Sequence, residues 1–203
     1  AALFPLQEAL GYNLAQSMFT AKKNVLLEGL TDLWYLEGIN SLFDKNLDQN
    51  IALLPVGTSA KISYYASMLS NNDLKSVALL DSDLAGDKAA QQEVVVHALG
   101  TKNILRTKEF LSREIKNSEI EDIIRETLAS IFFTEYAIQI NSEDLASEKA
   151  VVDIFKKADP KFSKFKLSKA FLNWAREHSS KDLTQDEIRN CEKLLESINR
   201  RLK

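Results

Sequence analysis

The sequence predicts an α/β fold with an open, mainly parallel sheet flanked by helices, followed by an all-helical C-terminal part. Strand-like and helix-like segments alternate along the first hundred residues. The strand-like segments NVLLE, IALLP and SVALLD are continuous apolar runs, which is typical of strands buried on both faces of a parallel sheet. Beyond about residue 107 the strand signal fades and helical periodicity continues alone.

The first half reads as successive strand–helix units, which imply right-handed crossover connections between parallel strands. The predicted helices cover residues 5–20, 32–44, 59–70 and 86–98. The predicted strands cover residues 24–28, 51–55 and 76–81, with a short fourth strand near 103–106. The turns EGLTD, PVGTSAK and DSDLAGD follow the first three strands. They would meet at the carboxyl edge of the sheet, where such folds bind their ligands.

The second half reads as helices. The segment SEIEDIIRETLASIFFTEYAI opens with a capping box from Ser118 to Glu121, and the last helix opens with another from Thr184 to Glu187. Further helices are predicted over residues 142–158 and 163–178. We therefore expect an α/β core at residues 1–115 and a helical part at residues 116–203.

Composition excludes several kinds of protein. The chain has 203 residues, 45% hydrophobic and 27% charged, which is a globular composition. No apolar run approaches the ~20 residues of a membrane span, and no signal-peptide pattern is present. The single cysteine, Cys191, excludes an internal disulfide and a cysteine-based zinc site, and fits a reducing, cytoplasmic setting. His97 and His178 are far apart in sequence, so metal chemistry would have to use carboxylates.

Charge is unevenly distributed. Residues 1–100 hold six Lys and eleven acids, a balance of −5, whereas residues 101–203 hold twenty basic and eighteen acidic residues, a balance of +2. The segment 156–169 carries six Lys against the single acid Asp159. An acidic half beside a basic segment indicates a polyanionic substrate handled with divalent cations.

Three acidic clusters are candidates for such a site. They are Glu28 with Asp32, Asp81 with Asp83, and the group Glu119, Glu121 and Asp122. The first two follow predicted strands, so we expect them to converge on one edge of the sheet. Carboxylates gathered there would repel one another unless a cation neutralised them, and oxygen ligands suit Mg²⁺ or Mn²⁺. Two such ions ~3.5–4 Å apart can stabilise the attacking and leaving oxygens of a phosphoryl displacement.

Each cluster has a simpler interpretation when taken alone. An acid such as Glu28 at a strand end is usually solvated, and the capping box already explains Glu121. An Asp-x-Asp after an apolar strand also occurs in receiver domains and in haloacid dehalogenase-type phosphatases. The phosphatase pattern has Thr or Val two residues beyond the second Asp, whereas this chain has Ala85 there. The joint pattern of all three clusters is what favours a metal site.

A strand ending in Glu28-Gly29 and a later strand ending in Asp81-Ser82-Asp83 resemble the Toprim pattern of topoisomerases, bacterial primases and certain nucleases. The match is closer to the Toprim half of the overcoming-lysogenisation-defect (OLD) nucleases, a group that includes the Gabija anti-phage nuclease. The segments that carry this resemblance are ALGYNLAQSMFTAKKNVLLEGLTDLWYL, LPVGTSAKI, ALLDSDLAGD, SEIEDII and FSKFKLSKAFLNW. They span most of residues 9–175.

The resemblance implies metal-dependent nicking or cleavage of DNA through two Mg²⁺ or Mn²⁺ ions. It implies that the metals are held by five carboxylates: Glu28, Asp32, Asp81, Asp83 and Glu121. Glu28 would also move a proton, and Lys164 would stabilise charge on the phosphate. The neighbours Lys161, Lys166 and Lys169 are alternatives to Lys164, or form a solvated face that follows the phosphate backbone. The residues expected to contact DNA are Lys61, Lys164, Lys166 and Lys169.

The sequence departs from the family at Leu30, where Pro is frequent, and at Thr58, where a second Gly is common. Both changes affect turn geometry more than chemistry. An ATPase usually precedes this region in the family, yet no G-x-x-x-x-G-K occurs here. Either an ATPase domain lies upstream in the full-length chain, which fits a start inside a predicted helix, or this chain works without one. The resemblance implies that any homodimer would form mostly through that upstream part. The alternatives are a non-catalytic or regulatory Toprim DNA-binding module, or a Toprim module of a primase or topoisomerase.

Overall fold

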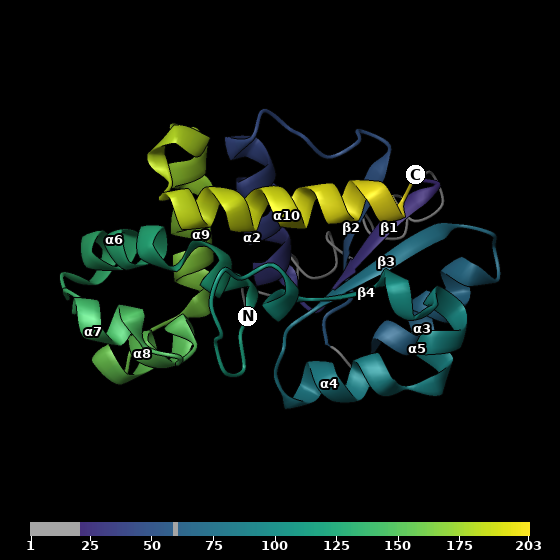
Figure 1. Ribbon diagram of the computed structural model, residues 1–203, viewed down its shortest axis with the longest axis horizontal. Coiled ribbons are helices and arrows are strands. Elements are labelled where there is room, and N and C mark those ends of the chain that lie inside the picture. Colours follow the sequence, from purple (N-terminus) through teal and green to yellow (C-terminus); the bar gives the residue numbers. More distant parts are fainter. Residues whose placement is uncertain (1–20, 59–60) are drawn as a thin grey trace, which may run out of the picture.

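A four-stranded, all-parallel sheet lies at the centre of the computed structural model, which describes residues 21–58 and 61–203 (Figure 1). The strands, in the spatial order β2–β1–β3–β4, are β1 (Lys23–Leu27), β2 (Ile51–Pro55), β3 (Lys75–Leu80) and β4 (Ile104–Arg106). Each lies within one residue of its predicted position, so the predicted parallel α/β sheet is confirmed. The predicted helix 5–20 lies outside the described residues.

Helices follow the strands in the first half and make up nearly all of the regular structure in the second half. In the first half they are α2 (Leu30–Leu42), α3 (Ile62–Ser70), α4 (Leu84–Gln91) and α5 (Glu93–Leu99). In the second half they are α6 (Arg125–Tyr136), α7 (Ser142–Ala146), α8 (Val151–Ala158), α9 (Lys164–Ala175) and α10 (Gln185–Arg201). Short 3₁₀ helices are η2 (Thr101–Asn103), η3 (Thr107–Glu109), η4 (Ile120–Ile124) and η5 (Ser180–Asp182).

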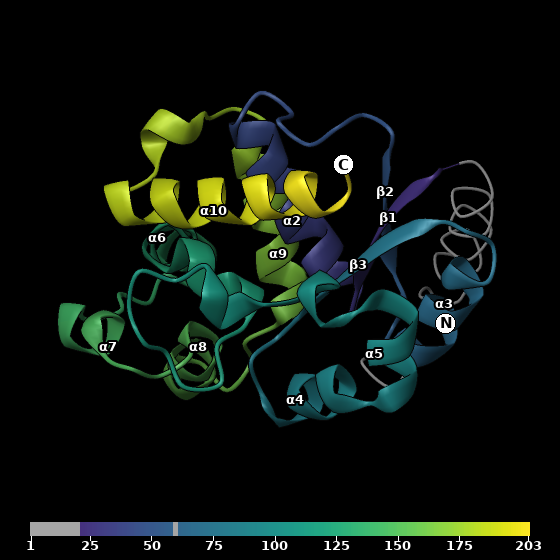
Figure 2. The ribbon, with the colours of Figure 1, turned by 45° about the vertical axis from the view of Figure 1, so that its right-hand side comes forward.

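Successive strand residues point to opposite faces of the sheet, and each face has its own helical layer. Leu26 and Leu80 belong to one apolar core, with residues of α3, α4 and α5. Val25 and Leu79 belong to the other core, which also includes residues of α2, η4, α6, α8, α9 and α10. Figure 2 shows α10 and α2 on one side of the sheet and α3, α4 and α5 on the other. The helical second half therefore packs on the same face of the sheet as the first-half helix α2.

Two predicted helices are each interrupted. The predicted helix 86–98 is wrong as one element, because Gln92 is extended (φ −63°, ψ 126°) and separates α4 from α5. The predicted helix 142–158 is also two helices, α7 and α8. Between them the chain pairs with Lys116, whose N–H donates to the carbonyl of Glu148 at 2.8 Å. In this second case a long-range backbone pairing prevails over local helix propensity.

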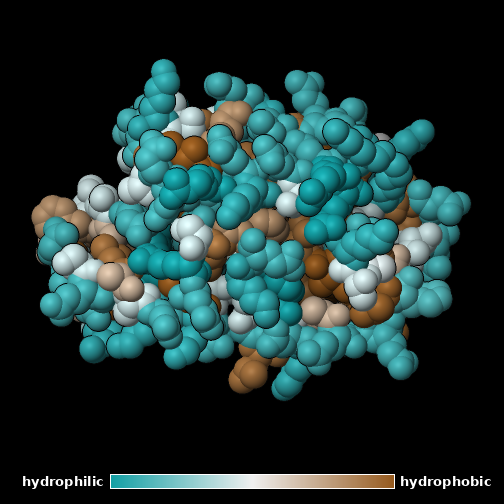
Figure 3. Space-filling view, in the orientation of Figure 1, coloured by the Kyte–Doolittle hydropathy of each residue, from teal (hydrophilic) through white to brown (hydrophobic). Residues whose placement is uncertain are grey.

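The surface seen in Figure 3 is largely hydrophilic, with apolar side chains visible mainly between polar ones. No helix among residues 21–58 and 61–203 has the length and apolar character needed to cross a membrane.

The helices α2 and α9 pack tightly against each other at Gly38. A Cβ atom built on Gly38 would lie 2.5 Å from Cε1 of Phe171, whose side chain is fully buried. Real Cβ atoms do not approach other atoms so closely, so glycine allows the two helices to touch. This contact is part of the packing that holds α9, the helix that begins at Lys164, against α2.

Replacing Gly38 with Ala is expected to lower the free energy of unfolding by about 1–3 kcal/mol, because overpacking in a core costs that much. The higher helix propensity of Ala offsets part of this loss. Urea unfolding would measure the change. The double variant Gly38→Ala/Phe171→Leu should recover much of the stability, since it removes the ring that clashes. A single variant as stable as the original protein would contradict the proposed contact.

Candidate active site

The first two acids lie at the carboxyl ends of adjacent strands. β1 and β3 pair in parallel with Leu27 opposite Leu79, so Glu28 and Asp81 leave the sheet close together. The Glu28 Oε1 atom accepts a hydrogen bond of 3.0 Å from the backbone N–H of Asp81. Burial, with further contributions from the charges of Asp32 and Asp83, raises the pKa of Glu28 to about 7. This carboxyl group therefore titrates near neutral pH.

Asp32 lies in the first turn of α2, as the sequence predicts. Its Oδ2 atom accepts a hydrogen bond of 2.7 Å from the backbone N–H of Gly29, so the side chain closes the turn that follows β1. Burial raises the pKa of Asp32, the charge of Lys164 lowers it, and Glu119 raises it further. These effects show that Asp32 lies in the same electrostatic environment as residues of the second half.

Both the side chain and the backbone of Asp81 make close contacts with other segments. Its Oδ1 atom accepts a hydrogen bond of 3.1 Å from the backbone N–H of Ile120, at the start of η4. Burial and then the charges of Asp32 and Glu121 raise its pKa well above the ordinary range. The helix α4 lies directly against its backbone: a Cβ built on Gly86 would be 2.0 Å from the Asp81 carbonyl oxygen. Only glycine fits at that position.

The side chain of Asp83 points toward the N-terminus of α4. Its Oδ1 atom accepts a hydrogen bond of 2.7 Å from the backbone N–H of Gly86 and so caps the N-terminus of α4. Its charge nevertheless contributes to the raised pKa of Glu28. Asp83 thus borders the acidic site, with one carboxylate oxygen already used by the helix cap.

Glu121 and Lys164 bring the second half into the site. The Glu121 side chain is fully buried, and neither of its carboxylate oxygens has a hydrogen-bond partner among the described residues. The Nζ atom of Lys164 lies 3.3 Å from Glu121 Oε1 and 2.5 Å from Glu119 Oε2. Burial raises the pKa of Glu121 to about 8, although Lys164 opposes this effect. The charges of Glu121 and Glu119 outweigh burial and raise the pKa of Lys164.

The predicted capping box from Ser118 to Glu121 is wrong. The backbone N–H of Glu119 donates to Asp122 Oδ2 at 3.0 Å, so the box is shifted by one residue and Glu121 takes no part in it. Ser118 instead contacts Thr107, whose hydroxyl donates to the Ser118 carbonyl at 2.7 Å. Because helix capping does not use Glu121, its carboxylate is directed into the acidic site.

Only one of the four candidate lysines of the second half reaches the acids. Lys166 pairs with Glu135 at 3.2 Å and lies 4.4 Å above the Tyr136 ring. Lys161 and Lys169 are exposed, and no carboxylate in the described part of the chain pairs with either side chain. Lys61 is exposed immediately before α3, in the turn after β2.

Sequence reasoning missed two residues beside the site. Arg106, at the end of β4, donates from Nη2 to the Asp81 carbonyl at 2.6 Å and pairs with Asp87 at 2.7 Å. Two features of the sequence could have identified Arg106: it is the first arginine of the chain, and it lies at the carboxyl end of a predicted strand. Tyr35 is fully buried, and its hydroxyl has no hydrogen-bond partner among residues 21–58 and 61–203. Burial and then the charges of Glu121 and Asp32 raise the pKa of Tyr35.

The residues present fit a hard divalent cation by their chemistry. All the donors are carboxylate oxygens, which Mg²⁺ and Mn²⁺ prefer. The buried carboxylate of Glu121 pairs with Lys164 but has no hydrogen bond within the described residues, and the raised pKa values of Asp81 and Glu121 indicate that Lys164 alone does not neutralise these acids. Within the described ranges, however, no three acidic, histidine or cysteine side chains already converge as a ligand set. The oxygens of Glu28, Asp32 and Asp81 instead accept hydrogen bonds from backbone N–H groups, and Lys164 donates to Glu119.

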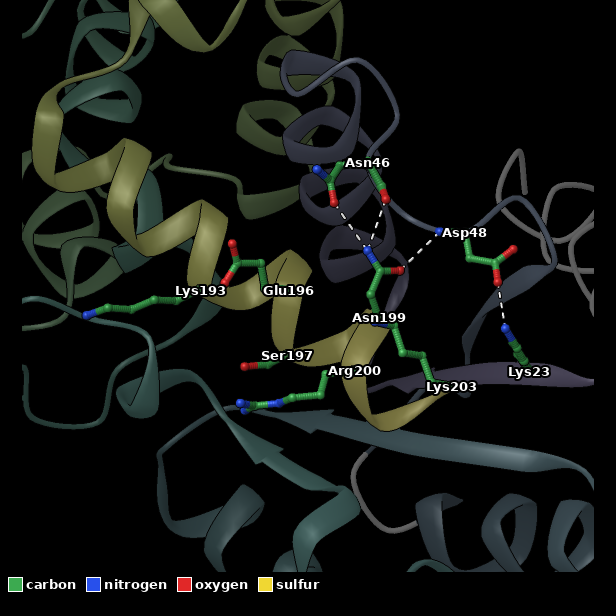
Figure 4. Close-up of a pocket in the computed structure, with 9 residues that line it drawn as sticks. All are labelled: Lys23, Asn46, Asp48, Lys193, Glu196, Ser197, Asn199, Arg200 and Lys203. Carbon is green, nitrogen blue, oxygen red and sulfur yellow. Dashed lines mark hydrogen bonds and ion pairs between the residues drawn. The ribbon is translucent and has the colours of Figure 1, made fainter.

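A cleft of about 630 Å³ lies apart from these acids, around the C-terminal end of α10 and the first residue of β1 (Figure 4). Four of the residues that line it are hydrogen-bonded to one another. Lys23 bonds to Asp48 at 2.6 Å, and Asn199 bonds to the carbonyl of Asn46 at 3.0 Å and to the backbone N–H of Asp48 at 3.1 Å. This cleft has no acidic cluster and is not the candidate active site.

The all-parallel sheet, with acids following β1 and β3 at its carboxyl edge, has the architecture of a Toprim domain. Residues 19–83 match the family model described as "Overcoming lysogenization defect protein-like, TOPRIM domain". The chain therefore carries an OLD-like Toprim domain, and the matched segment contains Glu28, Asp32, Asp81 and Asp83.

Solved structures extend the likeness of fold to nearly the whole chain. The C-terminal region of the Xanthomonas campestris pv. campestris OLD protein superposes with a TM-score of 0.56 at 15% identity, covering 92% of this chain and 96% of that one. The C-terminal region of the Burkholderia pseudomallei OLD protein gives a TM-score of 0.56 at 12% identity, covering 88% and 98%. No curated protein sequence matches significantly. The closer likeness to Gabija stays a prediction.

Proposed function

We propose that this chain is the nuclease part of an OLD-type protein and cleaves DNA phosphodiester bonds with the help of divalent cations. The observation that carries the proposal is the mutual electrostatic repulsion among carboxylates from four separate segments, three of which also interact with Lys164: Asp32, Asp81 and Glu121. Glu28 follows β1, Asp32 opens α2, Asp81 follows β3 and Glu121 lies in η4. Burial and mutual repulsion raise the pKa of each of them, and a bound cation would relieve that repulsion.

In this proposal the carboxylates of Glu28, Asp32, Asp81, Asp83 and Glu121 hold two Mg²⁺ or Mn²⁺ ions. When bound, such ions polarise the phosphate and lower the pKa of a bound water. Glu28, with a pKa of about 7, accepts or donates a proton near neutral pH. Lys164 provides a fixed positive charge that stabilises charge developing on the phosphate. Lys61 and Lys169 are free to contact the DNA backbone, whereas Lys166 would first have to leave Glu135.

The wider context of the proposal comes from the OLD proteins. The matching solved structures are C-terminal regions of OLD proteins. By likeness to that family, we propose that an ATPase domain upstream in the full-length protein controls access to DNA. Dimerisation through that upstream part, a cytoplasmic location and a role in defence against phage follow from the same likeness.

Nicking of supercoiled plasmid DNA tests the proposed activity. Nicking should require Mg²⁺ or Mn²⁺ and should fall by about 100-fold or more in Glu28→Ala and in Asp81→Ala, a loss typical of removing a group that stabilises the transition state. Glu37→Ala is the matched control, because Glu37 is an exposed acid on α2 away from the cluster. Its activity should be unchanged. Cleavage that persists with EDTA, or in both site variants, would refute the proposal.

A second function is a non-catalytic, regulatory Toprim DNA-binding module. The observation in its favour is that Lys164 already bonds to Glu119 and pairs with Glu121. Within residues 21–58 and 61–203, no three carboxylates form a ready ligand set. In that case a cation would only stabilise the fold, and the Asp81→Ala protein would bind DNA as well as the original protein without either of them cleaving it.

A further inference from the structure

Two aromatic side chains, on the helices that carry Asp32 and Lys164, lie outside both apolar cores. Trp34 on α2 and Phe165 on α9 contact each other, with ring centroids 4.8 Å apart and ring planes tilted by 52°. Among the described residues, neither belongs to the two core clusters or packs against them. The Phe165 side chain is 40% exposed, so one part of its ring is open to solvent.

Both rings are carried by residues that adjoin the site in sequence. Trp34 comes two residues after Asp32 in α2. Phe165 directly follows Lys164, whose ammonium group reaches Glu119 and Glu121. The aromatic pair is therefore fixed to the same two helix starts that carry Asp32 and Lys164.

A cation lies one helical turn from the exposed ring. Lys169 is four residues after Phe165 in α9, so the two side chains share one face of the helix. Lys169 is exposed, and within the described part of the chain no carboxylate pairs with its side chain. An exposed aromatic ring next to a free cation is the combination that binds single-stranded nucleic acid, because the ring stacks on a base while the cation contacts a phosphate.

We propose that Trp34 and Phe165 form a stacking platform for an unpaired base, so that the substrate is DNA with an unpaired nucleotide next to the cleaved phosphodiester bond. The inference rests on the proposed nuclease function and specifies its substrate class. Bases inside a duplex have both faces covered by neighbouring bases, whereas an unpaired base can lay one face on a protein ring. The platform therefore discriminates between DNA structures and not between base sequences.

The fluorescence of Trp34 gives a direct test that does not depend on cleavage. Trp34 and Trp174 are the two tryptophans of the chain, so Trp174→Phe leaves Trp34 as the sole reporter. In EDTA, a single-stranded oligonucleotide should quench Trp34 fluorescence, and a blunt duplex of the same sequence should not. Equal quenching by both DNAs, or no quenching by either, would overturn the platform.

A matched pair of variants separates stacking from simple apolar contact. Phe165→Leu keeps an apolar side chain but removes the ring, and it should weaken binding of single-stranded DNA by at least about fivefold, as loss of base stacking does. Phe165→Tyr keeps the ring and should restore the affinity. If Phe165→Leu binds as tightly as the original protein, the platform is refuted.

The outcomes distinguish this inference from the proposed activity. Quenching specific to single strands in a protein that never cleaves DNA would refute the nuclease and support the platform as a binding site. Metal-dependent cleavage with no preference for unpaired DNA, and unchanged by Phe165→Leu, would refute the platform alone.

Discussion

Replacing Lys164 with Met is expected to lower the free energy of unfolding by about 3 kcal/mol at pH 8 in a metal-free buffer, the size of loss seen when a buried ion pair is left without one partner. Lys164 lies 2.5 Å from Glu119 Oε2 and 3.3 Å from Glu121 Oε1, and Glu121 is fully buried. Without the ammonium group these carboxylates must take up protons or remain charged without a partner. Chemical unfolding with urea would measure the difference.

Lys166→Met is the matched control, because Lys166 lies on the same helix and pairs with Glu135 at the surface. Exposed pairs contribute about 0–1 kcal/mol, so this variant should be nearly as stable as the original protein. The double variant Lys164→Met/Glu121→Gln should recover part of the lost stability, since it removes one of the unpaired charges. Equal losses in the two lysine variants would show that Lys164 is not a partner of the buried acids.

The second large effect is a fall in the stability of the metal-free protein as pH rises from about 5 to about 8. The pKa of Glu28 is raised from 4.5 to about 7, and that of Glu121 from 4.5 to about 8. Between the unfolded and folded pKa values the folded protein holds more protons than the unfolded chain, so unfolding becomes easier as pH increases. The stabilisation that protonated Glu28 and Glu121 contribute is fully present below about pH 4.5 and is lost as the pH passes through 7 to 8. The total change should be a few kcal/mol.

Measurements of unfolding at several pH values in EDTA, and again with Mn²⁺, would check this dependence. Glu121→Gln should flatten the upper part of the pH range, because Gln carries no proton to lose. Asp48→Asn is the matched control, since the bonds of Asp48 to Lys23 and Asn50 lower its pKa to about 2, outside the range tested. Mn²⁺ should reduce the slope by stabilising the charged carboxylates. A metal-free protein that becomes more stable between pH 5 and 8 would contradict the account of the site.

The parallel sheet could be predicted because its strands are short continuous apolar runs, each ended by a polar turn. Since parallel strands end at the same edge, the neighbouring positions of Glu28 and Asp81 followed from the same argument, and their 3.0 Å hydrogen bond agrees with it. Local patterns also predicted correctly that Asp32 lies in the first turn of its helix and that Thr184 and Glu187 form a capping box.

Predictions that depended on tertiary contacts were less successful. The capping residue before η4 is Glu119 and not Ser118, because Ser118 is bonded to Thr107, eleven residues earlier. The contacts of Arg106 with Asp81 and of Lys164 with Glu121 join segments that are distant in sequence. The periodicity of apolar residues along the sequence carries no information about contacts between distant segments. The choice of Lys164 over its neighbours came from a family resemblance, and the boundary near residue 115 stays a prediction.

The central claim is that the carboxylates at the edge of the sheet hold divalent cations, and calorimetric titration of the protein with Mn²⁺ tests it most directly. The account predicts two weakly bound ions, with binding lost or greatly weakened in Asp81→Asn and unchanged in Glu37→Ala. One tightly bound ion without DNA cleavage would favour the regulatory module instead. Mn²⁺ binding that is absent, or equally strong in Asp81→Asn, would contradict the claim.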